Sequence, residues 1–135
     1  MLTKLASRTL PAGLAGALLL CGCASPFALF YDPARHAHPA AAVQQAEPVL
    51  ELSRDPDADG RRLAQEGFVL IGSSFFFGSA LTDHLMYRTE AVAQGMKLGA
   101  TLVLLDADYN DVVADGCCVR LFASYWTAAD HAAAM

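Results

Sequence analysis

The residues that precede Cys23 limit how much of this 135-residue chain can form a folded core. Lys4 and Arg8 give the chain a positively charged start, and an uncharged apolar run from Leu10 to Leu20 follows them. This order is typical of a secretory signal. The run is only about half of the roughly 20 apolar residues that a helix needs to cross a bilayer. We therefore expect residues 1–22 to be a cleaved signal rather than a permanent transmembrane helix.

The end of the signal resembles the bacterial lipobox. Leu20 occupies the aliphatic site of that motif, Gly22 the small site before the cleavage, and Cys23 the residue whose thiol becomes lipidated. Cys21 departs from the commoner Ala or Ser, and it permits a rival frame in which the bulky Leu20 would precede the modified cysteine. The resemblance implies a membrane anchor at Cys23. By resemblance to the sorting rule of enterobacterial lipoproteins, Ala24 after it implies the outer membrane, with the domain facing the periplasm or the cell surface.

Composition changes after the lipidation site. Residues 23–47 are rich in Ala and Pro, so we expect a flexible, semi-extended tether, then one small domain over residues 48–126 and a flexible tail over residues 127–135. Without Lys4 and Arg8 the chain has seven Lys and Arg against fourteen Asp and Glu, a formal charge of −7. Such a surface repels phosphates, so nucleic acid is not an expected partner.

Hydrophobic patterning predicts an α+β domain, with a small mixed sheet of three to four strands and one main crossover helix. The predicted strands are Val49–Leu52, Phe68–Ile71, Thr101–Leu105 and Cys118–Trp126. We expect the last two to form an antiparallel hairpin across a polar turn region at residues 106–116. A turn or two of helix is expected over residues 61–66.

The main helix is predicted from about Asp83 to Leu98. Thr82 or Asp83 can cap its first N–H groups, and Gly99 suits the position after its last turn. Its apolar residues fall near one stripe, formed by Leu85, Val92 and Met96 with Met86 beside them. A stripe of this kind normally faces the core.

Several of these segments together resemble a domain found in many uncharacterised bacterial lipoproteins. The shared features are the strand from Gly67 to Phe75 with its Ile-Gly-Ser-Ser-Phe sequence, the helix end from Met96 to Ala100, and the closing pair Tyr125-Trp126. The match covers roughly residues 53–126. More distantly, the order of helix, strand and hairpin is similar to that of the lipoprotein sensor of the Rcs envelope-stress pathway and of the small YbjQ-like domains. The resemblance implies a fold and a location, and no established activity comes with it.

An acidic segment satisfies the pattern of a calcium-binding EF-hand loop. Asp55, Asp57, Asp59 and Glu66 stand at loop positions 1, 3, 5 and 12, with Gly60 at position 6. Two features argue against a calcium site: Arg62 stands where the loop normally has an aliphatic residue, and a β-like run replaces the exiting helix. The alternative is a solvated turn before a short helix.

Cys117 and Cys118 are adjacent, and after lipidation of Cys23 they are the only thiols left in the mature chain. In an oxidising compartment they can remain structural thiols, form a vicinal or an intermolecular disulfide, or act in redox chemistry. Successive side chains of a strand point to opposite faces, which makes a shared metal site awkward.

Phe75, Phe76 and Phe77 cannot all face inward from one strand, so at least one of them should be exposed. The alternatives are a bend that buries two of them and an apolar patch for a partner. No catalytic set stands out, and we do not expect an enzyme. The leading hypothesis is a binding or structural module of the cell envelope, held by lipid and joined to an envelope protein. The alternative is a calcium- or redox-responsive sensor domain.

Overall fold

A computed structural model of the chain describes residues 24–35, 46–113 and 118–130. It confirms the predicted α+β class, with helices and strands in one mixed sheet. The sheet has five strands, more than the three to four that the sequence predicted. The elements in chain order are α2 (Pro26–Leu29), β1 (Tyr31–Pro33), β2 (Val49–Leu52), α3 (Pro56–Gln65), β3 (Phe68–Ser79), α4 (His84–Leu98), β4 (Leu102–Val113) and β5 (Cys118–Ala128).

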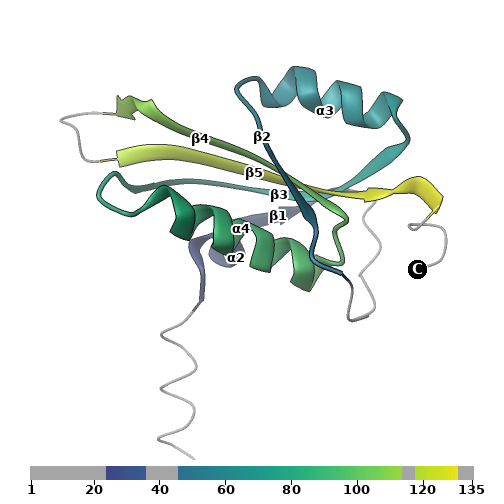
Figure 1. Cartoon of the computed structure of the whole chain (residues 1–135), viewed down its shortest axis with the longest axis horizontal. Coiled ribbons are helices and arrows are strands. Elements are labelled where there is room, and N and C mark those ends of the chain that lie inside the picture. Colours follow the sequence, from purple (N-terminus) through teal and green to yellow (C-terminus); the bar gives the residue numbers. More distant parts are fainter. Residues whose placement is uncertain (1–23, 36–45, 114–117, 131–135) are drawn as a thin grey trace, which may run out of the picture.

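The strand order across the sheet is β1-β3-β5-β4-β2. β2 and β4 pair in parallel, and the other neighbours are antiparallel, including the predicted β4–β5 hairpin. The crossover through α4 joins β3 and β4, which run in the same direction but are separated by β5. In Figure 1 the sheet is seen nearly edge-on, with α3 on one side and α4 and α2 on the other.

The long strands extend beyond their predicted ends. β4 continues through Asp106 and Asp108 to Val113, where the sequence indicated a polar turn, and β5 continues to Ala128, within the predicted flexible tail. The physical reason is the pairing of Asp106 with Phe122 and of Asp108 with Arg120. One face of an antiparallel sheet can remain open to water, so polar side chains are tolerated there.

α3 is also longer than predicted, with ten residues instead of a turn or two. Asp55 is its N-cap, and its Oδ1 accepts a hydrogen bond from the N–H of Ala58 at 3.0 Å. Pro56 stands at the first helical position, where a missing N–H costs nothing. These two residues begin the helix earlier than its apolar content indicated.

α4 has the predicted bounds, with Asp83 as its N-cap and Gly99 at its end in the left-handed conformation, φ 74°. The apolar stripe faces away from the core, however, with Leu85 66 % exposed. The buried side of the helix consists of Tyr87, Ala91, Gln94 and Gly95. A side chain at position 95 would collide with Val103 of β4, so small residues on this side let the helix lie close to the sheet.

The N-terminal segment is part of the fold, so the tether prediction is wrong for residues 25–33. Phe27 of α2 is fully buried (0 % exposed), and its ring meets that of Phe76 edge to face at a centroid distance of 4.8 Å. β1 pairs with residues 72–74 of β3 and forms one edge of the sheet. Residues 36–45 of the predicted tether are outside the described residues.

Gly72 and Ser74 explain how the N-terminal segment attaches to β3. An added Cβ at position 72 would lie 2.7 Å from the Asp32 carbonyl oxygen, so only glycine lets β1 approach this closely. The Ser74 hydroxyl is 2.7 Å from the Phe27 carbonyl oxygen, to which it donates, and 3.0 Å from the Tyr125 hydroxyl. Burial raises the pKa of Tyr125 to about 12, so its hydroxyl stays protonated at physiological pH and can take part in this buried hydrogen bond.

The two faces of the sheet carry separate cores. The larger core lies under α2 and α4, and the smaller lies under α3, where Leu63 packs with Leu102, Leu104 and Trp126. None of the helices within the described ranges is long and apolar enough to cross a membrane.

We expect Phe27→Ala to lower the free energy of unfolding by about 3–5 kcal/mol, the range for removing a fully buried aromatic side chain. Leu29→Ala, in the same helix but on an exposed side chain, is the matched control and should change stability by less than about 0.5 kcal/mol. Urea denaturation of the mature protein measures both. Equal, small effects of the two substitutions would show that α2 is not part of the cooperative fold.

Candidate functional site

The α3 side of the sheet is only half covered. Paired residues on β3, β5 and β4 form cross-strand rows on this side, and α3 covers the rows near Trp126 and Leu102. The rows nearer the β4–β5 hairpin remain open, as the bare left part of the sheet in Figure 1 shows. We call these rows the open platform; they contain Phe75, Phe122 and Asp106 in one row, and Phe77, Arg120 and Asp108 in the next.

The three consecutive phenylalanines divide between the two faces. Phe76 is 5 % exposed and belongs to the larger core, whereas Phe75 and Phe77 are 49 % and 52 % exposed on the platform. The two exposed rings meet edge to face at a centroid distance of 5.5 Å. β3 runs through all three residues without a register shift, so the proposed bend that would bury two of them does not occur.

Arg120 lies between two carboxylates on the platform. Its guanidinium is 3.7 Å from the Asp108 carboxylate and 4.0 Å from that of Asp106. Burial raises the pKa of Asp106, with a further rise from the charge of Asp108, and the charge of Arg120 opposes both. A buried carboxylate with its nearest cation at this distance is incompletely compensated.

A groove of about 500 Å³ runs from the platform to the start of α3. Its walls combine two aromatic rings with charged side chains and the first residues of the helix: Arg54, Asp55, Pro56, Asp57, Phe75, Asp106, Arg120 and Phe122. Four of these eight residues come from the platform, so groove and platform form one continuous surface. Such a surface offers a partner apolar area together with positively charged guanidinium groups and negatively charged carboxylates.

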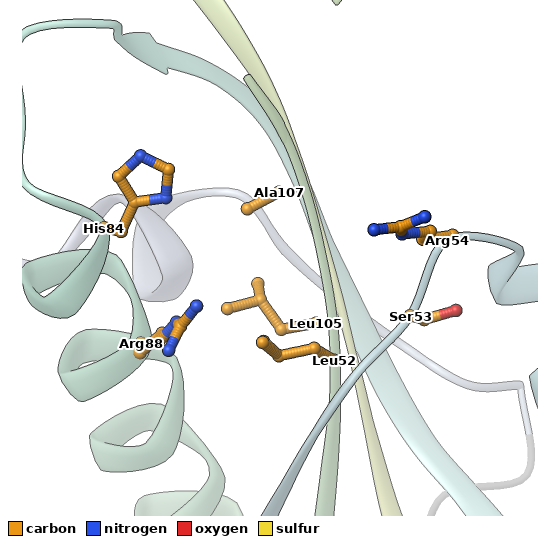
Figure 2. Close-up of a pocket in the computed structure, with 7 residues that line it drawn as sticks. All are labelled: Leu52, Ser53, Arg54, His84, Arg88, Leu105 and Ala107. Carbon is orange, nitrogen blue, oxygen red and sulfur yellow. The ribbon is translucent and has the colours of Figure 1, made fainter. Parts of the chain in front are cut away.

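A second, smaller hollow of about 160 Å³ lies between the first turns of α4 and the end of β2. Figure 2 shows His84 and Arg88 pointing from α4 toward Leu52, Leu105 and Ala107. Arg54 and Ser53 lie beyond these apolar residues, and Arg54 lines both hollows. Within the described ranges, neither Arg54 nor Arg88 forms an ion pair with an acidic side chain.

The predicted calcium ligands do not converge. The segment is a helix, in which Asp55 and Glu66 stand at opposite ends, roughly 15 Å apart at about 1.5 Å per residue. Asp55 is occupied as the N-cap, Asp59 accepts a hydrogen bond from Ser53 at 2.6 Å, and Glu66 pairs with Arg62 at 3.2 Å. Asp57 is exposed in the first turn. In the part of the chain that the structure describes, no group of three or more His, Cys, Asp or Glu side chains could hold a metal ion.

Two of the other predicted site residues, Cys23 and Cys117, are outside the described residues. Cys118 begins β5, beside Ser79 of β3, and it is disulfide-bonded. The alternative in which the cysteines remain structural thiols therefore does not hold for Cys118.

Sequence reasoning found the phenylalanines but missed Arg54, Asp106, Arg120 and Phe122. Asp106 was assigned to a turn, and Arg120 was assigned to a strand whose pairing register was unknown. The alternation of Arg120, Phe122 and Ser124 with the aliphatic residues Leu121 and Ala123 was the available signal that the two faces of β5 have different surroundings. The cross-strand pairing that assembles the platform is not visible in the sequence.

No protein-family model, curated protein or solved structure matches this chain.

We expect Asp106→Asn to stabilise the fold at neutral pH. The pKa of Asp106 is raised above the ordinary 3.8 in the folded state, so the folded protein holds this proton to higher pH than the unfolded chain does. Stability is therefore lost as the pH rises from 3.8 through the raised pKa, and the asparagine removes that loss. The gain should shrink toward zero as the pH falls below this window. Urea denaturation across the acidic and neutral range measures it, and a gain that does not vary with pH would contradict this account.

Proposed function

We propose that this protein is a lipid-anchored lipoprotein of the bacterial outer membrane, whose domain binds an envelope protein through the open platform. The observation that carries the binding role is the pair of exposed rings, Phe75 and Phe77, beside Arg120 on an uncovered half of the sheet. The anchoring role rests on the signal-like N-terminus and on the Leu-Cys-Gly-Cys sequence that ends at Cys23.

The composition of the platform supports a protein partner. Aromatic and arginine side chains are enriched at protein interfaces and dominate their binding energy. Phe75 and Phe77 supply apolar area, and half-buried Phe122 lies beside Phe75 on the next strand. Scattered exposed apolar residues need no explanation, but a contiguous cluster bordered by charges marks an interaction surface.

The charges around the groove indicate the chemistry of the partner. Carboxylates outnumber guanidinium groups along the groove and platform, with Asp55, Asp57, Asp106 and Asp108 against Arg54 and Arg120. Asp106 is incompletely compensated by Arg120. The complementary surface is therefore apolar at its centre, with Lys or Arg positioned to reach Asp106 and Asp57.

The redox form of the sensor alternative stays a prediction, because Cys117 is outside the described residues. The calcium form is not proposed, because its four carboxylates lie along a helix instead of around a cavity.

Lipidation of Cys23 is tested by the mass of the mature N-terminus. We expect a chain that begins at Cys23 and carries a diacylglyceryl adduct on its thiol. Cys23→Ser should abolish both the adduct and the cleavage, whereas the matched control Cys21→Ser should leave both unchanged. An adduct that survives Cys23→Ser but disappears with Cys21→Ser would show that the rival frame is used, and a native chain with no adduct would refute the anchor.

The binding role is tested by photo-crosslinking in intact cells. A photoreactive phenylalanine analogue at position 77 should form an adduct with one envelope protein, which mass spectrometry then identifies. The same analogue at position 69, which is exposed on the same strand but lies outside the platform, is the positional control.

Phe75→Ser should reduce the adduct from position 77 roughly tenfold, the effect of losing a central interface aromatic. Leu81→Ser, at an almost fully exposed position after the end of β3 that is not one of the platform residues, should leave the adduct unchanged. Equal adducts from positions 69 and 77, or no effect of Phe75→Ser, would mean that the platform is not the binding surface.

A further inference from the structure

The outward side of α4 is uncharged along its whole length. On a helix, residues roughly opposite to the buried side chains Tyr87, Ala91, Gln94 and Gly95 point to solvent. Those residues, which we call the outer face of α4, are Leu85, Met86, Thr89, Val92, Ala93 and Met96. Leu85, Met86 and Met96 are all exposed. A solvent-facing helix side normally carries charged or polar residues, so this face is unusual for a helix surrounded by water.

A second set of exposed apolar side chains lies on and directly after α2, the helix that contacts α4. Leu29 and Phe30, in and directly after α2, are both exposed. The Phe30 ring stacks on Phe76 at a centroid distance of 5.9 Å, and Phe76 in turn contacts Tyr87 of α4. α2 and α4 therefore lie side by side on one side of the sheet, opposite to α3 (Figure 1). Together they form an apolar surface, which we call the α2–α4 face.

The proposed lipid attachment site is close to this surface. Ser25, which caps α2 by accepting a hydrogen bond from Phe27, is two positions after Cys23 in the chain. Two residues of extended chain span at most about 7 Å. Because α2 is fixed to the sheet by the burial of Phe27, acyl chains on Cys23 would hold the α2–α4 face near the bilayer surface.

We propose that the α2–α4 face rests on the lipid bilayer, with the outer face of α4 lying in the interface. This inference depends on the proposed lipidation of Cys23. The apolar side chains of a helix that lies in the plane of the membrane reach about 5–10 Å into the boundary between headgroups and acyl chains. Leucine, methionine and phenylalanine side chains on this face suit that depth, and the anchor removes most of the entropic cost of bringing them there.

The charges beside the outer face favour the same orientation. α4 carries Arg88 and Lys97 against one acid, Glu90, in a chain that is acidic as a whole. Arg88 projects beside His84 at the hollow in Figure 2. Basic side chains near a bilayer are attracted to anionic headgroups. On the opposite side of the sheet, α3 balances Asp57 and Asp59 with Arg61 and Arg62, so that helix has no excess of basic residues.

The orientation would leave the open platform accessible. The platform lies on the α3 side of the sheet, so it would face away from the bilayer when the α2–α4 face rests on it. The domain would then be presented in a fixed orientation, instead of moving on a long tether. A fixed orientation reduces the freedom that is lost when a partner binds.

The test is the depth of a nitroxide label in the lipidated protein, reconstituted in vesicles of phosphatidylethanolamine and phosphatidylglycerol. Met86→Cys places the label on the outer face of α4, and Phe77→Cys, at a similarly exposed position on the platform, is the matched control. We expect the label at position 86 to collide often with oxygen, which is concentrated in the bilayer. Its collisions with a water-soluble nickel chelate should be several-fold less frequent than those of the label at position 77. The protein without an introduced cysteine gives the background.

The mass of the N-terminus is determined on the same samples, so that the two proposals can fail separately. An acylated protein whose label at position 86 is as accessible to the nickel chelate as the label at position 77 overturns the docking and leaves the anchor intact. A label at position 86 shielded from both oxygen and the chelate would show that protein covers the face, which also overturns it. A protein without acyl chains overturns both proposals.

Discussion

The burial of Phe27 is the interaction on which the arrangement of this protein depends. Its ring fills the larger core against Phe76, and its carbonyl oxygen accepts a hydrogen bond from buried Ser74. Without this contact, α2 and the short strand β1 would have too few residues to remain folded on the sheet. With it, the chain immediately after Cys23 becomes part of a rigid domain. The position of any lipid at Cys23 is thereby fixed relative to the two faces of the sheet.

The two faces of the sheet consequently have different roles in our proposals. The side with α2 and α4 carries an uncharged outer surface and the nearest path to the proposed anchor. The side with α3 carries the open platform, where Phe75 and Phe77 lie beside the charged group formed by Asp106, Asp108 and Arg120. Asp106 reduces the stability of the isolated domain because burial opposes its ionisation. A residue that costs stability without contributing to the core is typical of a binding surface.

Two of three errors of prediction have a common physical origin in packing, and the third arises from local helix capping. The stripe of Leu85, Val92 and Met96 faces outward, because Gly95 and Ala91 let α4 approach β4 more closely than larger residues would. The calcium pattern failed because Asp55 and Pro56 begin a helix before the loop could close around an ion. The tether prediction failed because the segment rich in alanine and proline also contains Phe27, whose ring is buried against Phe76 of the sheet. For the stripe and the tether, the tertiary contact that decided the role of the segment was absent from the local pattern, whereas the calcium pattern was overridden by local helix capping.

The sequence by itself determined the α+β class, the β4–β5 hairpin, the bounds of α4 and the impossibility of burying three consecutive phenylalanines on one face. These follow from hydrophobic period, capping residues and strand geometry, all of which act between residues close in the chain. Only the tertiary structure decided that residues 25–33 belong to the folded domain, that α4 turns its apolar stripe outward, and that Phe75, Arg120 and Asp106 share one surface. These depend on which strands are neighbours and how closely helix and sheet can approach. Such contacts join residues that are far apart in the chain, and no local spacing encodes them.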